Sequence, residues 1–146
     1  MKRALLFSLI ALLALFLPSQ ASTAAPVEAS ATGNRFVDLD GRRVRVQTIG
    51  LDTRSPGAPV VIFEAGAANS LDAWRDVVPR VAEMAPVIAY DRSGLGQSEW
   101  DGAAPTPLHV AGRLRRLLNR LDIDPPYILV GHSWGGMLVH WYAGYH

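Results

Sequence analysis

A serine lies in a Gly-x-Ser-x-Gly sequence between an apolar run that predicts a strand and a stretch that predicts a helix. The run, Tyr127 to Val130, is aromatic, aliphatic or β-branched throughout, which is typical of a strand buried on both faces of a parallel sheet. The flanking Gly131 and Gly135 leave room for a tight reversal, so Ser133 can stand at its apex with the hydroxyl exposed. This order of strand, turn and helix constrains the chain to a layered architecture of sheet and helices. It also makes Ser133 a candidate nucleophile.

The residue after the serine supplies a candidate oxyanion donor. Trp134 begins the predicted helix, where backbone amides lack intrahelical partners and the helix dipole favours negative charge. A Gly-x-Ser-x-Gly sequence alone also occurs in ordinary loops. The strand before it and the helix after it favour the interpretation as a nucleophile site.

Two further segments accompany the serine turn in a fixed order. Phe63 to Ala67 ends one apolar run, and Tyr90 to Ser98 follows the next with the sequence Tyr-Asp-Arg-Ser-Gly-Leu-Gly-Gln-Ser. Together the three motifs resemble those of the α/β-hydrolase superfamily, over about residues 35 to 146. That family often has His-Gly in its oxyanion loop, where this chain has Ala65-Gly66. The resemblance implies that the second oxyanion donor is the backbone amide of Ala67, which needs no imidazole.

The chain before the serine turn predicts strands alternating with helices. Residues 36–48 alternate in polarity around Asp40-Gly41, which predicts an antiparallel hairpin, and short apolar runs at Val60 to Phe63 and Val87 to Tyr90 predict buried parallel strands. We therefore expect the α/β class, specifically a truncated α/β-hydrolase fold with an N-terminal β-hairpin followed by parallel strands that alternate with helices.

Two helices are predicted from apolar residues at steps of three and four. The first covers Leu71 to Val81, with Trp74 in the core, and the second runs from a cap at Thr106-Pro107 to Leu121. Arginines within the second helix are interpreted as a solvated face: Arg113, Arg115, Arg116 and Arg120.

Asp91, at the end of a predicted strand, is a candidate for the acid of a catalytic triad. In the strand order that the resemblance implies, the Phe63 strand separates it from the Ser133 strand by roughly 9 to 10 Å. We therefore expect a structural role, in which the carboxylate accepts hydrogen bonds from the turn at Arg92 to Gly94. The histidines are interpreted as structural or surface residues, because a base must come within about 3 Å of the serine oxygen: His109, His132, His140 and His146.

The composition excludes several other classes of protein. The 146 residues are 49% hydrophobic, enough for one ordinary domain and too apolar for a disordered chain. A net charge of +1 gives no basic stripe, so no nucleic-acid partner is expected. The absence of cysteine excludes disulfides, a thiol nucleophile and a cysteine zinc site. The histidines show no metal-ligand spacing, and we expect neither a metal nor another cofactor.

The N-terminus has the pattern of a secretory signal peptide. A charged start, Met1 to Arg3, precedes the apolar run Ala4 to Leu17 and the small residues Ser19 to Ala25. The run is shorter than the roughly 18 residues of a spanning helix, which disfavours the alternative of a membrane anchor. We predict cleavage after a signal peptide at 1–24, a secreted or periplasmic location, and no stable membrane anchor in the mature protein.

The rest of the chain divides into a linker and one incomplete domain. Residues 25–34 are rich in small residues without an apolar period, and residues 35–146 form the N-terminal part of an α/β-hydrolase domain. In this family the acid and the histidine follow the serine in the chain, on loops after later strands. Because the sequence ends at His146, inside or just past the predicted helix, we expect a fragment that is inactive on its own.

The expected activity is that of a serine hydrolase. The resemblance implies attack by Ser133 on a carboxylic ester, an acyl-enzyme intermediate, and oxyanion stabilisation by the amides of Ala67 and Trp134. An amide substrate is the next choice, because Gly-His-Ser-Trp-Gly-Gly also resembles proline iminopeptidases. A non-catalytic binding protein with this fold is the alternative, whereas serine at the apex argues against the aspartate nucleophile of an epoxide hydrolase or dehalogenase. The expected partner is a small-molecule acyl substrate; its identity and the oligomeric state stay open.

Overall fold

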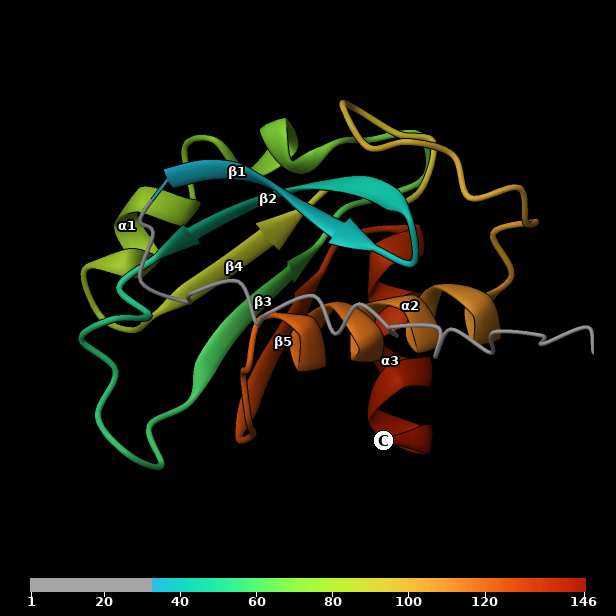
Figure 1. Cartoon of the computed structure of the whole chain (residues 1–146). Helices are drawn as coiled ribbons and strands as arrows, with labels where there is room; N and C mark the ends of the chain where they lie inside the picture. Colours follow the sequence, from blue (N-terminus) through green and yellow to red (C-terminus); the bar gives the residue numbers. More distant parts are fainter. Residues whose placement is uncertain (1–32) are drawn as a thin grey trace, which may run out of the picture.

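A five-stranded mixed sheet forms the centre of the computed structural model, which describes residues 33–146 (Figure 1). The strands are β1 (Gly33–Leu39), β2 (Arg42–Ile49), β3 (Val60–Glu64), β4 (Val87–Tyr90) and β5 (Tyr127–Gly131). The helices are the 3₁₀ helix η1 (Leu71–Trp74), α1 (Val78–Ala82), α2 (Pro107–Arg120) and α3 (Trp134–Tyr145). The predicted signal peptide and nearly all of the predicted linker lie outside the described residues.

The predicted hairpin is confirmed. β1 and β2 pair antiparallel, and both central residues of their turn have positive φ, 57° at Asp40 and 75° at Gly41. Such a turn follows the natural twist of the strands, which explains the preference for Asp-Gly. β1 begins at Gly33, two residues before Arg35, where the alternation of the sequence predicts its start.

The parallel part of the sheet has the expected strand order. From one edge to the other the strands run β1-β2-β4-β3-β5, with β3 parallel to both β4 and β5. β3 therefore separates the strand before Asp91 from the strand before Ser133, as predicted.

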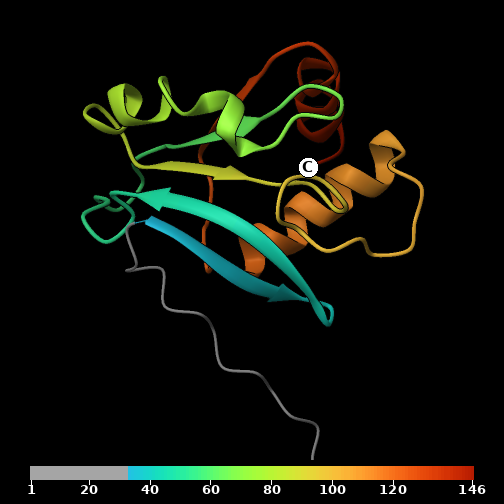
Figure 2. The ribbon, with the colours of Figure 1, turned by 90° about the horizontal axis from the view of Figure 1, so that it is seen from above.

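Each face of the sheet carries its own hydrophobic core. Val60 and Ile62 of β3 point into a cluster with α2 and α3, whereas Val61 and Phe63 point into a cluster with η1 and α1. Viewed from above, α1 and α2 lie on opposite sides of the sheet (Figure 2). The result is three layers, with the carboxyl ends of β3, β4 and β5 meeting at one edge.

The helix predicted over Leu71 to Val81 is wrong as a single element, since η1 and α1 are separate. Pro79 explains the break, because inside a continuous helix its ring would clash with the carbonyl of Arg75. In the structure Pro79 lies in the first turn of α1, where no amide hydrogen is needed. Trp74 belongs to the core as predicted, with its ring 5.0 Å from that of Phe63.

α2 confirms the predicted cap and apolar face, but not a face of four solvated arginines. Thr106 accepts a hydrogen bond from the amide of His109, and Val110 and Leu117 are buried. Arg113 is only 8% exposed and places its Nε 3.0 Å from a carboxylate oxygen of Asp101. The spacing accounts for this error, because position 113 lies three residues after Val110 and four before Leu117, on the buried face.

β5 is less buried than its sequence predicts. In the described part of the chain it pairs with β3 alone, as the last strand of the sheet, and the Ile128 side chain is 48% exposed. Within residues 33–146 this strand is therefore not buried on both faces. None of the helices within residues 33–146 is both long and apolar enough to cross a membrane.

Candidate active site

Ser133 occupies a strained turn between a strand and a helix. β5 ends at Gly131, α3 begins at Trp134, and Ser133 between them has φ 54° and ψ −127°. Such a conformation costs a residue with a side chain about 1–3 kcal/mol. The Ser133 residue is exposed, and its hydroxyl makes no capping bond to α3. The geometry is that of a serine presented outward by the fold around it.

The two glycines beside Ser133 are needed for close packing. A Cβ atom on Gly135 would lie 2.2 Å from the carbonyl oxygen of Glu64, and one on Gly131 would lie 2.5 Å from the carbonyl oxygen of Gly135. Both distances are far inside van der Waals contact. The predicted tight reversal is confirmed, and α3 begins directly against the end of β3.

The loop after β3 lies against the serine turn. A Cβ atom on Gly66 would be 3.3 Å from the Cβ atom of Ser133. The carbonyl of Gly66 accepts a hydrogen bond from the amide of Asn69 at 3.2 Å, closing a turn in which Ala68 has φ 57°. Ala67 is the first central residue of this turn and directly follows the glycine beside Ser133.

The structure places Ala67 and Trp134, but not Ser133, in the lining of one cavity. Ala67 and Trp134 both line a cavity of about 600 Å³, together with residues of the loop after β4 and of α2. Trp134 is the first residue of α3, so its amide has no acceptor within the helix. Most of the remaining lining is apolar, including Trp100, Val110 and Leu117.

A buried polar cluster under this loop was missed in the sequence. Glu64, the last residue of β3, is 1% exposed and accepts hydrogen bonds from the Tyr90 hydroxyl and the Arg92 guanidinium. Arg92 also donates to the carbonyls of Ala65 and Gly66. The cluster therefore links the ends of β3 and β4 to the loop that carries Ala67.

Burial controls the protonation of this cluster. Burial raises the pKa of the Glu64 carboxyl above its ordinary value, and the Tyr90 hydroxyl and Arg92 guanidinium oppose the shift by stabilising the carboxylate. Burial and the neighbouring charge of Glu64 raise the pKa of the Tyr90 phenol well above its ordinary value. Tyr90 therefore stays protonated and can donate to Glu64.

The His132 ring points at the loop after β3. Its Nε2 atom accepts a hydrogen bond from the amide of Gly66 at 3.1 Å, and its ring packs in a T-shaped arrangement with that of Trp74, with the ring centroids 5.1 Å apart. This contact was not visible in the sequence, because the two residues are 66 positions apart. Within residues 33–146, no imidazole forms a hydrogen bond to the Ser133 hydroxyl. His109 instead pairs with Asp101, at 2.8 Å.

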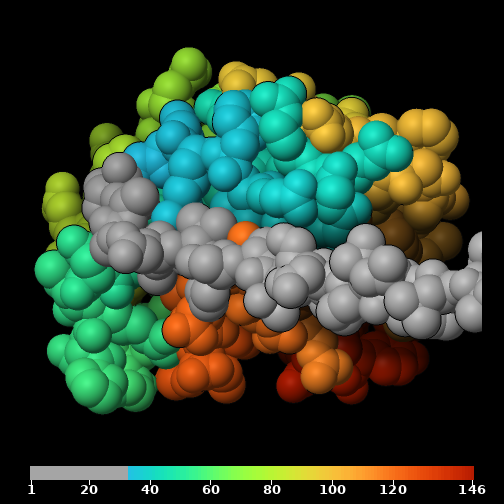
Figure 3. All heavy atoms as spheres, in the orientation of Figure 1, coloured from blue at the N-terminus to red at the C-terminus, as the bar shows by residue number. Residues whose placement is uncertain are grey.

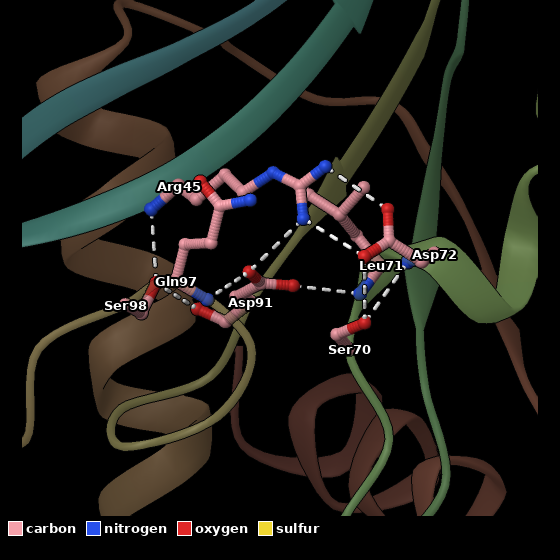
Figure 4. Close-up of polar contacts among 7 residues, drawn as sticks. All are labelled: Arg45, Ser70, Leu71, Asp72, Asp91, Gln97 and Ser98. Carbon is pink, nitrogen blue, oxygen red and sulfur yellow. Dashed lines mark hydrogen bonds and ion pairs between the residues drawn. The ribbon is translucent and has the colours of Figure 1, made fainter.

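Asp91 is fully buried and joins the start of η1 to the loop after β4 (Figure 4). Its carboxylate accepts hydrogen bonds from the amides of Leu71 at 2.7 Å and Gln97 at 2.8 Å, and Arg45 lies 3.7 Å away. The expected partners in the turn at Arg92 to Gly94 are wrong, since the Gly94 amide donates to the Glu99 carbonyl. The carboxylate thus connects η1 with the loop after β4.

The acidic and histidine side chains of the described chain do not form a metal site. Among the residues that the structure describes, no three His, Cys, Asp or Glu side chains are grouped so that they could hold a metal ion.

Comparisons with known proteins agree with this architecture. The family model for the alpha/beta hydrolase fold matches residues 59–146. A soluble epoxide hydrolase of a Corynebacterium species is 33% identical over 105 residues, covering 72% of this chain and 34% of the relative. An AB hydrolase superfamily protein of Gibberella zeae is 35% identical over 85 residues, covering 58% of this chain and 26% of the relative.

A solved structure of an epoxide hydrolase variant from Vigna radiata matches with a TM-score of 0.66 at 26% identity, over 77% of this chain and 34% of its own. This chain therefore spans about a third or less of the length of these proteins. The family model matches the chain from just before β3 to its last residue, and the similarity confirms the expected fold class. The chain belongs to the α/β-hydrolase family.

Proposed function

We propose that Ser133 is the nucleophile of a serine hydrolase that acts on carboxylic esters. The observation that carries the proposal is the backbone of Ser133, held at φ 54° and ψ −127° between β5 and α3. Strain of this kind is retained where the surrounding structure enforces it, as Gly131 and Gly135 do here. It presents the hydroxyl beside the loop that follows β3.

In the proposed reaction, the Ser133 oxygen attacks the ester carbonyl and forms a tetrahedral intermediate. The amides of Ala67 and Trp134 stabilise the negative oxygen of that intermediate. Loss of the alcohol leaves an acyl-enzyme, which water then hydrolyses to the carboxylic acid and free Ser133. This chain spans only part of the length of its relatives. We therefore place the base that accepts the serine proton in the full gene product and not among residues 33–146.

The nucleophile distinguishes this chemistry from that named for the epoxide hydrolase relatives. A carboxylate that opens an epoxide forms an ester, which water can cleave. Attack by the Ser133 oxygen on an epoxide carbon would form an ether, which water cannot cleave at a useful rate. An acyl substrate instead gives an ester at Ser133, so turnover can be completed.

Removal of the Ser133 hydroxyl tests the assignment in the full gene product that contains this chain. We expect wild-type protein to react covalently with a fluorophosphonate probe and Ser133→Ala to lose both the label and the hydrolysis of p-nitrophenyl acetate. Ser55→Ala is the matched control, because Ser55 is exposed and lies before the start of β3, whereas Ser133 lies beyond the far ends of β3 and β5. Folded wild-type protein without label at Ser133 would favour the alternative of a non-catalytic binding protein.

The location of the protein is a separate proposal. The charged start, apolar run and small residues of positions 1–25 support export with removal of the first 21 to 25 residues. Mass spectrometry of the exported protein should show a new N-terminus in this range. An intact Met1 on exported protein would contradict cleavage.

A further inference from the structure

We propose that Arg92 is a positioning residue for the oxyanion site, because one guanidinium contacts both the loop that carries Ala67 and the ring of Trp134. This inference rests on the proposed function, since it assigns a task within that site. Arg92 follows β4 and is only 5% exposed. No local sequence pattern connects it to either donor.

The first step is the geometry of the peptide between Gly66 and Ala67. In a trans peptide the carbonyl and the amide hydrogen point in opposite directions. Arg92 donates to the Gly66 carbonyl through Nη2, so it fixes the plane that also contains the Ala67 amide. A carbonyl held toward Arg92 sends the Ala67 N–H the other way.

The turn cannot supply this alignment by itself. The Gly66 carbonyl also accepts from the Asn69 amide, but that bond lies within the turn and moves with it. Arg92 comes from a different part of the chain, the loop directly after β4, and donates to the Ala65 carbonyl as well. It therefore fixes the turn relative to the sheet, and the sheet also carries the serine.

The second step is the contact with the other donor. The central carbon of the Arg92 guanidinium lies 5.0 Å from the centroid of the Trp134 ring, within the range of a cation–π interaction. Trp134 carries the amide that begins α3. One side chain thus contacts the residue of one donor and the peptide of the other, which couples their positions.

The third step is the anchor of the guanidinium. Glu64 pairs with Arg92 in a buried site and also accepts from Tyr90, so the charge has a partner away from water. Five donors in a planar fork allow Arg92 to reach Glu64, Ala65 and Gly66 together. A lysine carries the same charge on a single nitrogen and cannot span these acceptors in the same plane.

The test compares Arg92→Lys with wild type in the full gene product. We expect kcat for p-nitrophenyl acetate and the rate of fluorophosphonate labelling to fall by about 30- to 1000-fold, as for loss of an oxyanion donor, with KM changed by less than about threefold. Arg45→Lys is the matched control, since Arg45 is also a buried arginine bound to a carboxylate, that of Asp72. Its labelling rate should stay within about threefold of wild type.

Glu64→Gln provides a second variant with the same shape and a weaker anchor. We expect it to fold and to lower the labelling rate by about 5- to 30-fold, because Arg92 keeps an acceptor there but loses the opposite charge. Folded Arg92→Lys or Glu64→Gln protein that labels at the wild-type rate would overturn the positioning role. Should Arg92→Lys not fold, the rate of Glu64→Gln alone decides.

Failure of the proposed function gives a different result. Wild-type protein that shows no label at Ser133 would refute the nucleophile itself. Normal labelling in wild type and in either folded variant would refute only the role of Arg92.

Discussion

At the scale of single residues, the serine turn depends on glycines, which have no Cβ atom and so allow close packing of the backbone. Gly135 lets α3 start against the carbonyl of Glu64, and Ser133 is strained as a result. The sequence predicts these glycines, because Gly-x-Ser-x-Gly is a local pattern. It does not predict the contacts of Arg92 and His132 with Gly66, since their partners are 26 and 66 positions away.

Gly135→Ala should disrupt this turn. Its Cβ atom would meet the Glu64 carbonyl at 2.2 Å, so we expect a loss of about 1–3 kcal/mol of unfolding free energy and slower labelling of Ser133. Gly144→Ala is the control in the same helix, with nothing within 4 Å of the added atom. That variant should gain up to about 1 kcal/mol through helix propensity. Urea unfolding measures both, and equal effects would contradict the steric argument.

Asp101 should make the free energy of unfolding depend on pH in the acidic range. Burial alone raises the pKa of its carboxyl, but hydrogen bonds from His109 and the Ala103 amide, with the charge of Arg113, lower it to about 2. A folded pKa below the unfolded value, about 3.9, stabilises the fold above that pH, and the effect is lost as the pH falls toward 2. At neutral pH, Asp101→Asn should have a free energy of unfolding about 1–2 kcal/mol lower than wild type, a value that allows for the partial exposure of Asp101 to solvent.

The acid dependence itself is the test for Asp101. The difference in unfolding free energy between wild type and Asp101→Asn should shrink between about pH 5 and pH 2 in urea titrations. A difference that stays constant over this range would contradict the lowered pKa.

At the scale of elements, turn and cap residues were good predictors, whereas apolar spacing alone was not. Asp40-Gly41 and Thr106 determine their turn and cap through neighbouring backbone atoms, so the sequence predicts them. The apolar spacing from Leu71 to Val81 suggests one helix, yet Pro79 divides it. The steric effect of the Pro79 ring outweighs the helical spacing of the apolar residues. Both signals were visible in the sequence.

The C-terminus of α2 offers a test of backbone conformation. The Ile123 amide bonds to the Leu118 carbonyl at 3.0 Å and the Asp122 amide to the Asn119 carbonyl at 3.1 Å, with Asp122 at φ 57°. This is a Schellman motif, in which glycine fits best at the position of Asp122. Asp122→Gly should raise the unfolding free energy by about 0.5–1 kcal/mol. Asp122→Ala keeps the Cβ atom, so an equal gain in that variant would contradict this explanation.

At the scale of the molecule, the described sheet has two unequal edges. β1 of the hairpin forms one edge and carries the charged residues Arg35 and Asp38, and the loop after β4 packs beside the hairpin (Figure 3). β5 forms the other edge and exposes Ile128. Apolar strand edges pair with other chains unless they are covered or charged.

This chain expressed alone, as residues 25–146, should therefore self-associate through β5. Ile128→Lys places a charge on the exposed strand and should increase the monomer fraction in size-exclusion chromatography. Met84→Lys is the control, because Met84 is 81% exposed but lies after α1, away from β5. Equal effects of the two lysines would attribute the association to general hydrophobicity instead.

The buried carboxylate of Asp91 has a consequence for hydrogen exchange. It holds the amides of Leu71 and Gln97, which lie outside the strands of the sheet. Exchange of a hydrogen bonded to a buried acceptor requires an opening of the structure. These two amides should therefore exchange with deuterium as slowly as amides of β3, although amides in loops and at the first residue of a helix usually exchange fast. Two connecting segments would in this way open only when the central sheet opens.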